Sequence, residues 1–350
     1  QGYPAGLTDP SVFNPLLANI TYMPRDNKTS SVQSWFASVQ RQIGLKTVID
    51  LAYVGNKADD LLLFANYNQA RPGTGSLQSR RPIAGFGDIT YAFNGGFSRY
   101  KSVQLRVEHR SRSLTLLNAF TLSKAEDNGA GTLENPNGNF PAPQDFYNLA
   151  AEVGLSAYDQ PWNNTTSLVW DLPVGKGRRY GSKLSGLGQA ALGGWRLALI
   201  NNMWAGEPVT FQYSPVAALV VSGIQQDFRG ANNYRPNVVG NPLLPKDRRS
   251  PAAFFDPAAV VIPTDASQPF GNATRNSVRG PNFYQLDMAL SKIFDLGYHD
   301  TRLELRLEAF NALNKTNFRA PSGNRSSAAF GTITATYDPR QLQVGVKLMF

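Results

Sequence analysis

The side chains that most often carry catalysis are scarce in this chain of 350 residues, which contains no cysteine and only two histidines. Without cysteine there can be no disulfides, thiol nucleophiles or thiolate metal ligands, and two histidines leave little for an imidazole-based site. The sequence offers no triad, paired-carboxylate cleft or metal-ligand cluster of recognisable spacing. We therefore expect no enzyme activity, with no catalytic residue, no cofactor and no metal.

Two segments carry side chains of the kind that bind small ligands. Residues 126–139 are rich in Asp, Glu and Asn, whose oxygens are the ligands that Ca²⁺ prefers. Because the segment lacks an ordered ligand spacing, a solvated loop is the favoured interpretation. Gly175 and Gly177 stand among basic residues and could cradle a phosphate, but such loops normally join a strand to a helix. A turn between antiparallel strands fits residues 174–180 better.

Charged residues alternate with leucines near the end of the chain, which predicts a strand with one charged face: Arg302, Glu304, Arg306 and Glu308. A helix would scatter these charges around its surface. Together with Arg106 and Glu108, they could form a charged ladder that lines a lumen and contacts a plug. Ion pairs between neighbouring strands are the favoured interpretation, because opposite charges across a sheet stabilise each other modestly.

The end of the chain shows the clearest alternation of apolar and polar residues. One face of the predicted strand carries Leu342, Val344, Val346, Leu348 and Phe350, and only Met349 breaks the pattern on the other face. A terminal aromatic residue preceded by apolar residues at alternate positions resembles the signal that the barrel-assembly machinery reads. An interfacial aromatic residue without that role is the alternative interpretation.

These residues must be positioned by strands, and period-two alternation predicts about nine of them. The predicted ranges are 32–43, 46–55, 98–110, 113–124, 163–172, 195–205, 286–292, 302–308 and 342–350. Tilted strands of about ten residues cross a bilayer, whereas the chain has no apolar run near the roughly 18 residues of a spanning helix. Only 17% of the residues are charged, against about 25% in typical globular chains. The pattern favours an all-β antiparallel transmembrane barrel.

The predicted connections alternate between short and long. Short ones fall at 44–45, 111–112 and 295–300, with a longer one at 174–194, whereas the long polar ones span 56–97, 125–162, 206–282 and 313–340. Outer-membrane barrels have short periplasmic turns and long extracellular loops, which is the same rhythm.

A soluble β-sandwich is the main alternative for alternating strands. Loops as long as 206–282 are rare in compact domains, which argues against a sandwich. Aromatic residues are also predicted near strand ends, as in the interfacial girdles of membrane barrels: Trp35, Tyr53, Phe120, Trp195, Phe294 and Phe350.

The charge distribution and the start of the chain add two expectations. The net charge is +9, but the basic residues are spread along the chain without a basic block, so we expect no nucleic-acid partner. The chain opens at Gln1 and shows no signal peptide, so we interpret it as a fragment or a processed product.

Ordered motifs along the chain are similar to those of the Oar-like TonB-dependent receptors. They are SVQRQIG (38–44), LAYVGNK (51–57), NQARPG (68–73), RRPIAGFGDI (80–89), FTLSKAEDN (120–128), LPVGKGRRY (172–180), GGWRL (193–197), FFDPAA (254–259), FGNATRNSVRGP (270–281), FNALNKTNF (310–318), FGTIT (330–334) and DPRQLQVGVKLMF (338–350). The resemblance covers most of the chain and is closest in its last third. Asn118 departs from it, since the family more often has a small apolar residue there.

The resemblance implies that residues 1–350 are the C-terminal part of a plugged barrel of roughly 22 strands. An odd number of strands does not close a bacterial single-chain barrel, so the plug and the first strands are expected upstream of Gln1. The expected function is uptake of a large ligand, captured by the outer loops, across the bacterial outer membrane. The implied partners are outer-membrane lipid, the TonB complex and the barrel-assembly machinery. The alternatives are an adhesion or structural barrel without active uptake, a passive porin-like pore, and a soluble β-rich binding module.

Overall fold

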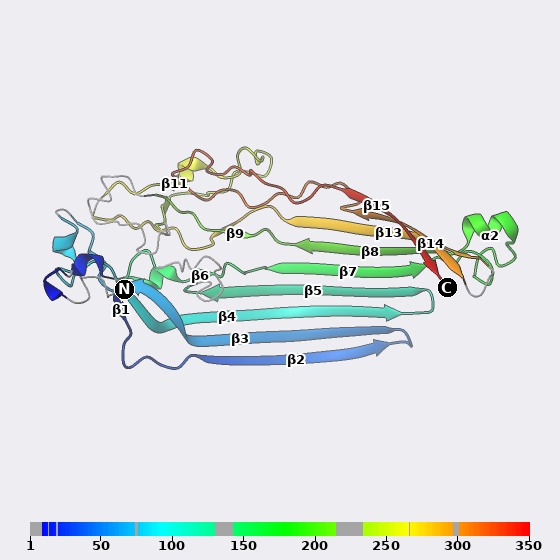
Figure 1. Ribbon diagram of the computed structural model, residues 1–350, viewed down its shortest axis with the longest axis horizontal. Helices are drawn as coiled ribbons and strands as arrows, with labels where there is room; N and C mark the ends of the chain where they lie inside the picture. Colours follow the sequence, from blue (N-terminus) through cyan, green and yellow to red (C-terminus); the bar gives the residue numbers. More distant parts are fainter. Residues whose placement is uncertain are drawn as a thin grey trace.

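The computed structural model is built around one large antiparallel sheet (Figure 1). It describes residues 9–296 and 301–350, except 13, 19, 74–75, 130–142, 215–233 and 266. The strands follow one another across the sheet in the order β15-β14-β13-β8-β7-β5-β4-β3-β2. Their bounds are β2 (Ser31–Ile43), β3 (Thr47–Asn66), β4 (Ile89–Arg110), β5 (Leu114–Asp127), β7 (Trp162–Asp171), β8 (Trp195–Trp204), β13 (Phe283–Asp295), β14 (Arg302–Phe310) and β15 (Gln341–Met349).

All nine predicted strands are present, so the all-β antiparallel fold is confirmed. The predicted loop at 56–97 is wrong over much of its length, because β3 and β4 remain paired from Lys57–Arg99 to Asn66–Thr90. The register shifts near Asp60, whose φ is 56°, and this irregularity breaks the alternation that marks a strand. Tyr53 consequently lies inside β3 rather than at its end, and Phe120 lies inside β5, which extends to Asp127.

Short elements fill the connections between the long strands. A parallel strand, β1 (Ile20–Tyr22), pairs with β4, and β6 (Gly154–Leu155) pairs with β5. Two small sheets join β9 (Pro208–Val209) to β12 (Val278–Arg279), and β10 (Asn237–Val238) to β11 (Val260–Val261). The remaining elements are the helix α2 (Gly186–Leu192) and the 3-10 turns η1 (Pro10–Val12), η2 (Pro15–Leu17), η3 (Gln78–Arg80), η4 (Leu149–Glu152) and η5 (Pro257–Ala259). Among the described helices, none has both the length and the apolar character needed to span a membrane.

The apolar residues of neighbouring strands are in register and build one continuous apolar face. Leu305 on β14 lies opposite Val346 on β15, and Leu105 on β4 lies opposite Phe120 on β5. This face has no protein cover: Val344 remains 75% exposed, and Leu342, Val346 and Leu348 are also exposed. A sandwich would bury such a face against a second sheet, and the described residues place none there.

The sheet is open at both edges. In the described part of the chain, β2 pairs only with β3, and β15 pairs only with β14. Each edge therefore presents backbone N–H and C=O groups that no strand of this sheet satisfies.

Candidate functional site

The long connections meet at one end of the sheet, opposite the end that carries α2 and the C-terminus (Figure 1). We call the described residues of 67–88, 128–161, 205–282 and 311–340 the cap. Most of the buried apolar residues of the structure lie here rather than between the strands; the main cluster is Val209, Phe211, Phe254, Phe255, Val260, Ala273 and Val278. The connections predicted as long polar loops thus contain the hydrophobic core.

Aromatic side chains organise this core. The rings of Phe211 and Phe255 meet edge-to-face with centroids 4.9 Å apart, and Phe330, from the β14–β15 connection, lies 5.8 Å from each. Asp256 follows directly and caps η5 by accepting a hydrogen bond from the N–H of Ala258. The motif FFDPAA therefore supplies two core rings and the start of a turn.

A buried ion pair links two of the connections. The Arg235 guanidinium is 2% exposed, and its two terminal nitrogens donate to the two carboxylate oxygens of Glu152 at 2.8 and 2.9 Å. Arg235 also donates to the carbonyl oxygens of Ala273 and Ala151. Such a bidentate pair, with further bonds to backbone oxygens, offsets the cost of removing both charges from water.

Two further arginines tie the β8–β13 connection to the β5–β7 connection. Arg275 Nη2 lies 2.8 Å from Asp127 Oδ1 as an ion pair, and Arg275 Nη1 donates to the carbonyl oxygen of Glu152 at 2.9 Å. Arg279 pairs with the buried carboxylate of Asp159. Both arginines belong to the motif FGNATRNSVRGP, so its basic residues fasten the cap together.

The same motif needs glycine where two backbone segments come close. A Cβ atom on Gly271 would lie 2.3 Å from the carbonyl oxygen of Pro236, which real structures do not tolerate. The N–H of Gly271 donates to the carbonyl oxygen of Arg235, which draws the chain toward the ion pair.

Amide side chains join the β3–β4 connection to this network. Gln69 donates to the carbonyl oxygen of Gln144 and accepts from the N–H of Phe146. Gln144 in turn accepts from the N–H of Arg235 through its side-chain oxygen. Asn68 is fully buried, and its side chain bonds backbone groups of its own connection, including the N–H of Ile83 and the carbonyl oxygen of Gly87. The cap is therefore one hydrogen-bonded unit rather than a set of separate loops.

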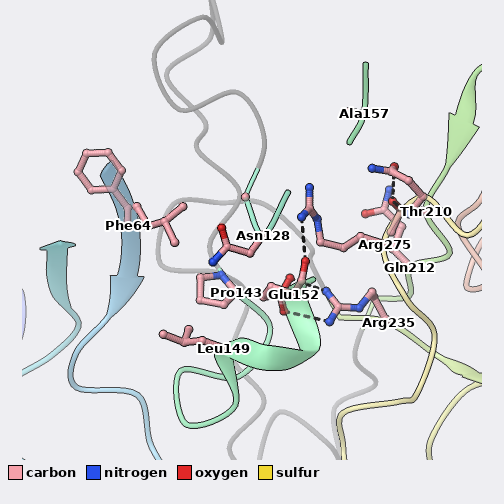
Figure 2. Close-up of a pocket in the computed structure, with 13 residues that line it drawn as sticks. Phe64, Asn128, Pro143, Leu149, Glu152, Ala157, Thr210, Gln212, Arg235 and Arg275 are labelled. Atoms are coloured by element: carbon pink, nitrogen blue, oxygen red, sulfur yellow. Dashed lines mark hydrogen bonds and ion pairs between the residues drawn. The ribbon is translucent and has the colours of Figure 1, made fainter. Parts of the chain in front are cut away.

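A cavity of about 240 Å³ lies beside these arginines (Figure 2). Figure 2 shows Glu152 between Arg235 and Arg275, with Phe64 and Leu149 on the side away from the arginines. Both guanidinium groups already face carboxylates, so the cavity offers apolar surface together with amide and hydroxyl groups, among them the exposed side chain of Gln212. This lining suits the capture of a polar organic group.

Asp145 and Tyr213 are among the cap residues whose pKa values are shifted. Burial raises the pKa of Asp145, although the nearby positive charge of Arg71 opposes the shift. Burial also raises the pKa of Tyr213, whose hydroxyl donates to the carbonyl oxygen of Pro269 at 2.6 Å. Tyr213 is thus a neutral hydrogen-bond donor inside the cap.

The residues predicted to form the barrel-assembly signal lie where the alternation of apolar and polar residues places them. Leu342, Val344, Val346 and Leu348 share the apolar face of β15, and Phe350 is 97% exposed at its end. Their positions are those of an outward-facing terminal strand, and their role in assembly stays a prediction.

The charge ladder occupies the opposite face of β14, but its ion pairs run along the strand. Arg306 Nη2 lies 2.8 Å from Glu308 Oε1, and Arg106 pairs with Glu108 in the same way at 2.7 Å. The expectation of pairing between strands is wrong for these residues, because β4 and β14 are separated by four other strands and each arginine reaches its own second neighbour. Arg302 and Glu304 continue the polar face, and the face borders a cavity of about 220 Å³.

The described residues of 126–139 and 174–180 form no ligand site. Most of 126–139 lies outside the described residues, and Asp127 is engaged by Arg275. Within 174–180 the N–H of Gly175 donates to the carbonyl oxygen of Tyr180, which closes a turn as expected. Across the described part of the chain, no three His, Asp or Glu side chains lie close enough to hold a metal ion.

Sequence reasoning missed the network around Arg235 and Glu152. The two residues are 83 positions apart, and no periodic pattern connects them. Arg275 and Arg279 belong to the motif FGNATRNSVRGP, so the motif marks part of the network but does not show which carboxylates these arginines pair with.

The match to a known protein family agrees with this architecture. The family described as "Outer membrane beta barrel domain" matches residues 1–343. No curated protein matches the chain. Among solved structures, the outer membrane transporter YddB from Escherichia coli shares 13% identity over 94% of this chain and 34% of its own, with a TM-score of 0.48. The FrpB iron transporter from Neisseria meningitidis (F3-3 variant) shares 14% identity over 94% and 32%, with a TM-score of 0.41. The chain thus spans about a third of the length of these transporters.

Proposed function

This chain belongs to the outer membrane β-barrel domain family and therefore lies in the bacterial outer membrane, and from that premise we propose that it is the C-terminal part of the barrel of an Oar-like, TonB-dependent transporter. In this proposal the barrel is plugged, and a large ligand captured at the outer surface passes through it with energy from the TonB complex. The chain itself acts as a transporter or receptor segment and catalyses no reaction.

The observation that carries the proposal is the open sheet. Hydrocarbon offers no partner for the backbone groups at the edges of β2 and β15, so a sheet in lipid must close on itself. The nine strands that follow one another across the sheet in the described part of the chain are an odd number for a bacterial single-chain barrel. Additional strands of the same protein would complete the closure, as in the large barrels that enclose a plug.

The cap supports the proposed capture of a ligand at the outer surface. Long connections are extracellular in outer-membrane barrels, so the cap faces the medium. Its ion pairs and aromatic core hold the cavity beside Arg235 and Arg275 in a fixed shape before any ligand arrives. A preorganised site saves the entropy that flexible loops would lose on binding.

The polar face of β14 supports the proposed passage of the ligand through the barrel. Arg302, Glu304, Arg306 and Glu308 face away from lipid, toward the enclosed interior, where a plug would contact them. The resemblance of the chain to Oar-like receptors, from SVQRQIG to DPRQLQVGVKLMF, supports the choice of that group within the barrel proteins.

The proposal can be tested without knowledge of the ligand. The full-length protein should bind the purified periplasmic domain of TonB in a pull-down, and it should conduct poorly in a planar bilayer. Deletion of its plug should abolish the pull-down and open a large conductance. A passive pore would conduct before the deletion, and an adhesion or structural barrel would not bind TonB in either form. Either result would overturn the proposal.

A further inference from the structure

The connection between β7 and β8 forms a distinct surface at the end of the sheet where the C-terminus lies (Figure 1). It spans residues 172–194 and contains α2 and the turn at 174–180. The turn is held against the helix, because the N–H of Lys176 donates to the side-chain oxygen of Gln189 at 2.7 Å. The β7–β8 surface, as we call residues 172–194, is therefore one structured unit rather than a loose loop.

Two side chains fasten the β7–β8 surface to the lipid-facing side of the barrel. The indole N–H of Trp195 donates to the carbonyl oxygen of Ala191 at 2.9 Å. The ammonium group of Lys292 donates to the carbonyl oxygens of Ala191 and Gly193 at 3.1 and 2.5 Å. Trp195 and Lys292 are register partners, and Lys292 also lies opposite Leu305 on the apolar face. The end of α2 is thus attached at the outward face.

These contacts also explain why a lysine can occupy an apolar face. Lys292 is only 6% exposed, and its ammonium lies 4.6 Å from the ring centroid of Trp195 and 5.2 Å from that of Phe294. The carbonyl oxygens at the end of a helix and the faces of aromatic rings both stabilise a cation. Lys292 therefore acts as the anchor of the β7–β8 surface, not as a charge left in hydrocarbon.

The β7–β8 surface carries positive charge that nothing in the described structure neutralises. Its four basic residues are all exposed: Lys176, Arg178, Arg179 and Lys183. Residues 172–194 contain no aspartate or glutamate, and the preceding carboxylate, Asp171, is engaged by Arg196 at 2.6 Å. No ion pair of the described residues involves any of the four.

Exposed apolar side chains accompany these charges. Leu187 is 89% exposed, and Leu192 and Tyr180 are each 55% exposed. A short helix with exposed leucines next to a basic cluster has the composition of segments that lie in the plane of a membrane interface. Because α2 is attached beside Trp195, it lies at the depth of the interfacial aromatic residues of membrane barrels.

We propose that the β7–β8 surface binds the phosphate groups of anionic phospholipids in the periplasmic leaflet of the outer membrane. Short connections are periplasmic in these barrels. The β7–β8 connection lies at the same end of the sheet as the short β2–β3 and β4–β5 connections, so the basic cluster faces that leaflet (Figure 1). Lysine and arginine bind the lipid phosphates, while Leu187 and Leu192 enter the boundary between headgroups and acyl chains. The short β2–β3 and β4–β5 connections also carry exposed basic residues, Lys46 and Arg112, which extends the positive charge along the same leaflet.

Because the chain contains no cysteine, a single introduced cysteine can be labelled without a background from this chain. Full-length protein with Leu187→Cys, labelled with an environment-sensitive fluorophore, is reconstituted in vesicles of phosphatidylcholine, with or without phosphatidylglycerol. We expect a blue shift of the emission when phosphatidylglycerol is present. An emission that stays solvent-like in both kinds of vesicle would overturn the proposal.

A charge variant shows whether the four basic residues are responsible. It replaces Lys176, Arg178, Arg179 and Lys183 by Gln, and its matched control replaces four exposed basic residues of the other end, Arg25, Lys28, Lys246 and Arg248. In native mass spectrometry from mixed detergent–lipid micelles, the first variant should retain phosphatidylglycerol at least tenfold less than the wild type, since each of the four basic residues is attracted to the anionic surface. The control should retain it fully.

The remaining outcomes separate lipid from other anions. If inorganic phosphate at millimolar concentration displaces phosphatidylglycerol completely, the surface is a free-anion site and the lipid assignment is wrong. Equal lipid retention by the charge variant and the wild type would also overturn it. Heat-modifiable mobility of each variant verifies folding, so a loss of lipid is not confused with a loss of the barrel.

Discussion

Asn118 on β5 donates a 2.8 Å hydrogen bond to the side-chain oxygen of Thr166, its direct partner on β7. The same amide donates to the side-chain oxygen of Asn164 at 2.9 Å. All three residues lie on the apolar face, in register with Leu116 and Leu168. The departure at Asn118 from the family pattern is therefore compensated by neighbours that satisfy it where lipid cannot.

Replacing Asn118 alone should lower the free energy of unfolding, whereas replacing Asn118, Asn164 and Thr166 together should not. Asn118→Ala leaves Asn164 and Thr166 with fewer partners in hydrocarbon and should lower the free energy of unfolding by about 1 kcal/mol. The triple variant Asn118→Leu, Asn164→Leu and Thr166→Val removes all three polar side chains, so none is left without a partner in hydrocarbon. Its free energy of unfolding should exceed that of the wild type. Urea unfolding in phospholipid vesicles, followed by tryptophan fluorescence, measures both. A triple variant less stable than the single one would contradict this account.

The cap should depend on the pair of Arg235 and Glu152. Arg235→Met leaves the Glu152 carboxylate buried without its cation, which typically costs about 3–5 kcal/mol. We expect the cap to become sensitive to protease added to intact cells. The double variant Arg235→Met, Glu152→Leu should recover much of the protection, since neither charge of this pair is then buried without its partner. Heat-modifiable mobility should stay normal in both, because the sheet does not include this pair.

The terminal residue should matter for assembly rather than for stability. Deletion of Phe350, which is almost fully exposed, removes little packing within the protein but removes the terminal aromatic group. We expect less heat-modifiable, folded protein in the outer membrane. Lys347→Gln, on the opposite face of β15, serves as the control and should assemble normally. Unchanged assembly without Phe350 would remove its assignment as a signal.

Asp145 should make the stability of the cap depend on pH. Burial raises the pKa of Asp145, so the ionised carboxylate is the disfavoured form in the folded cap, and stability falls as pH rises through the range where an aspartate ionises. Asp145→Asn keeps the acceptor for the N–H of Tyr147 and should stabilise the cap at about pH 7 but not at about pH 3, where the carboxyl is protonated. Hydrogen exchange of the cap at both values measures this.

A second aspartate of the cap provides the opposite control. Two hydrogen bonds from Ser267 lower the pKa of Asp265, so its ionised form is the favoured one. Asp265→Asn should therefore give no stabilisation at about pH 7. Equal responses of the two variants would show that the burial of Asp145 does not govern the effect.

The strands could be predicted from the sequence because lipid imposes a local rule. Every second residue of a strand such as β15 must be apolar, so a ten-residue window contains the signal. The rule fails where other contacts intervene, as at Asp60, where the register shifts, and at Lys292, where a helix end supplies carbonyl oxygens. The cap follows no such rule, because Arg235 and Glu152 meet across 83 positions of irregular chain and only a folded structure brings them together.

The charge ladder gives a final prediction that separates a structural role from contact with a plug. Arg306→Glu breaks the pair with Glu308 and places two like charges side by side, at a cost of less than about 1 kcal/mol for a half-exposed pair. If the pair only satisfies a polar interior, the swap Arg306→Glu, Glu308→Arg should restore the unfolding free energy, and the conductance of the full-length protein in planar bilayers should stay low throughout. A plug that contacts Arg306 directly would be displaced by either variant. Conductance that rises in the swapped protein, despite its recovered stability, would therefore identify Arg306 as a contact of the plug.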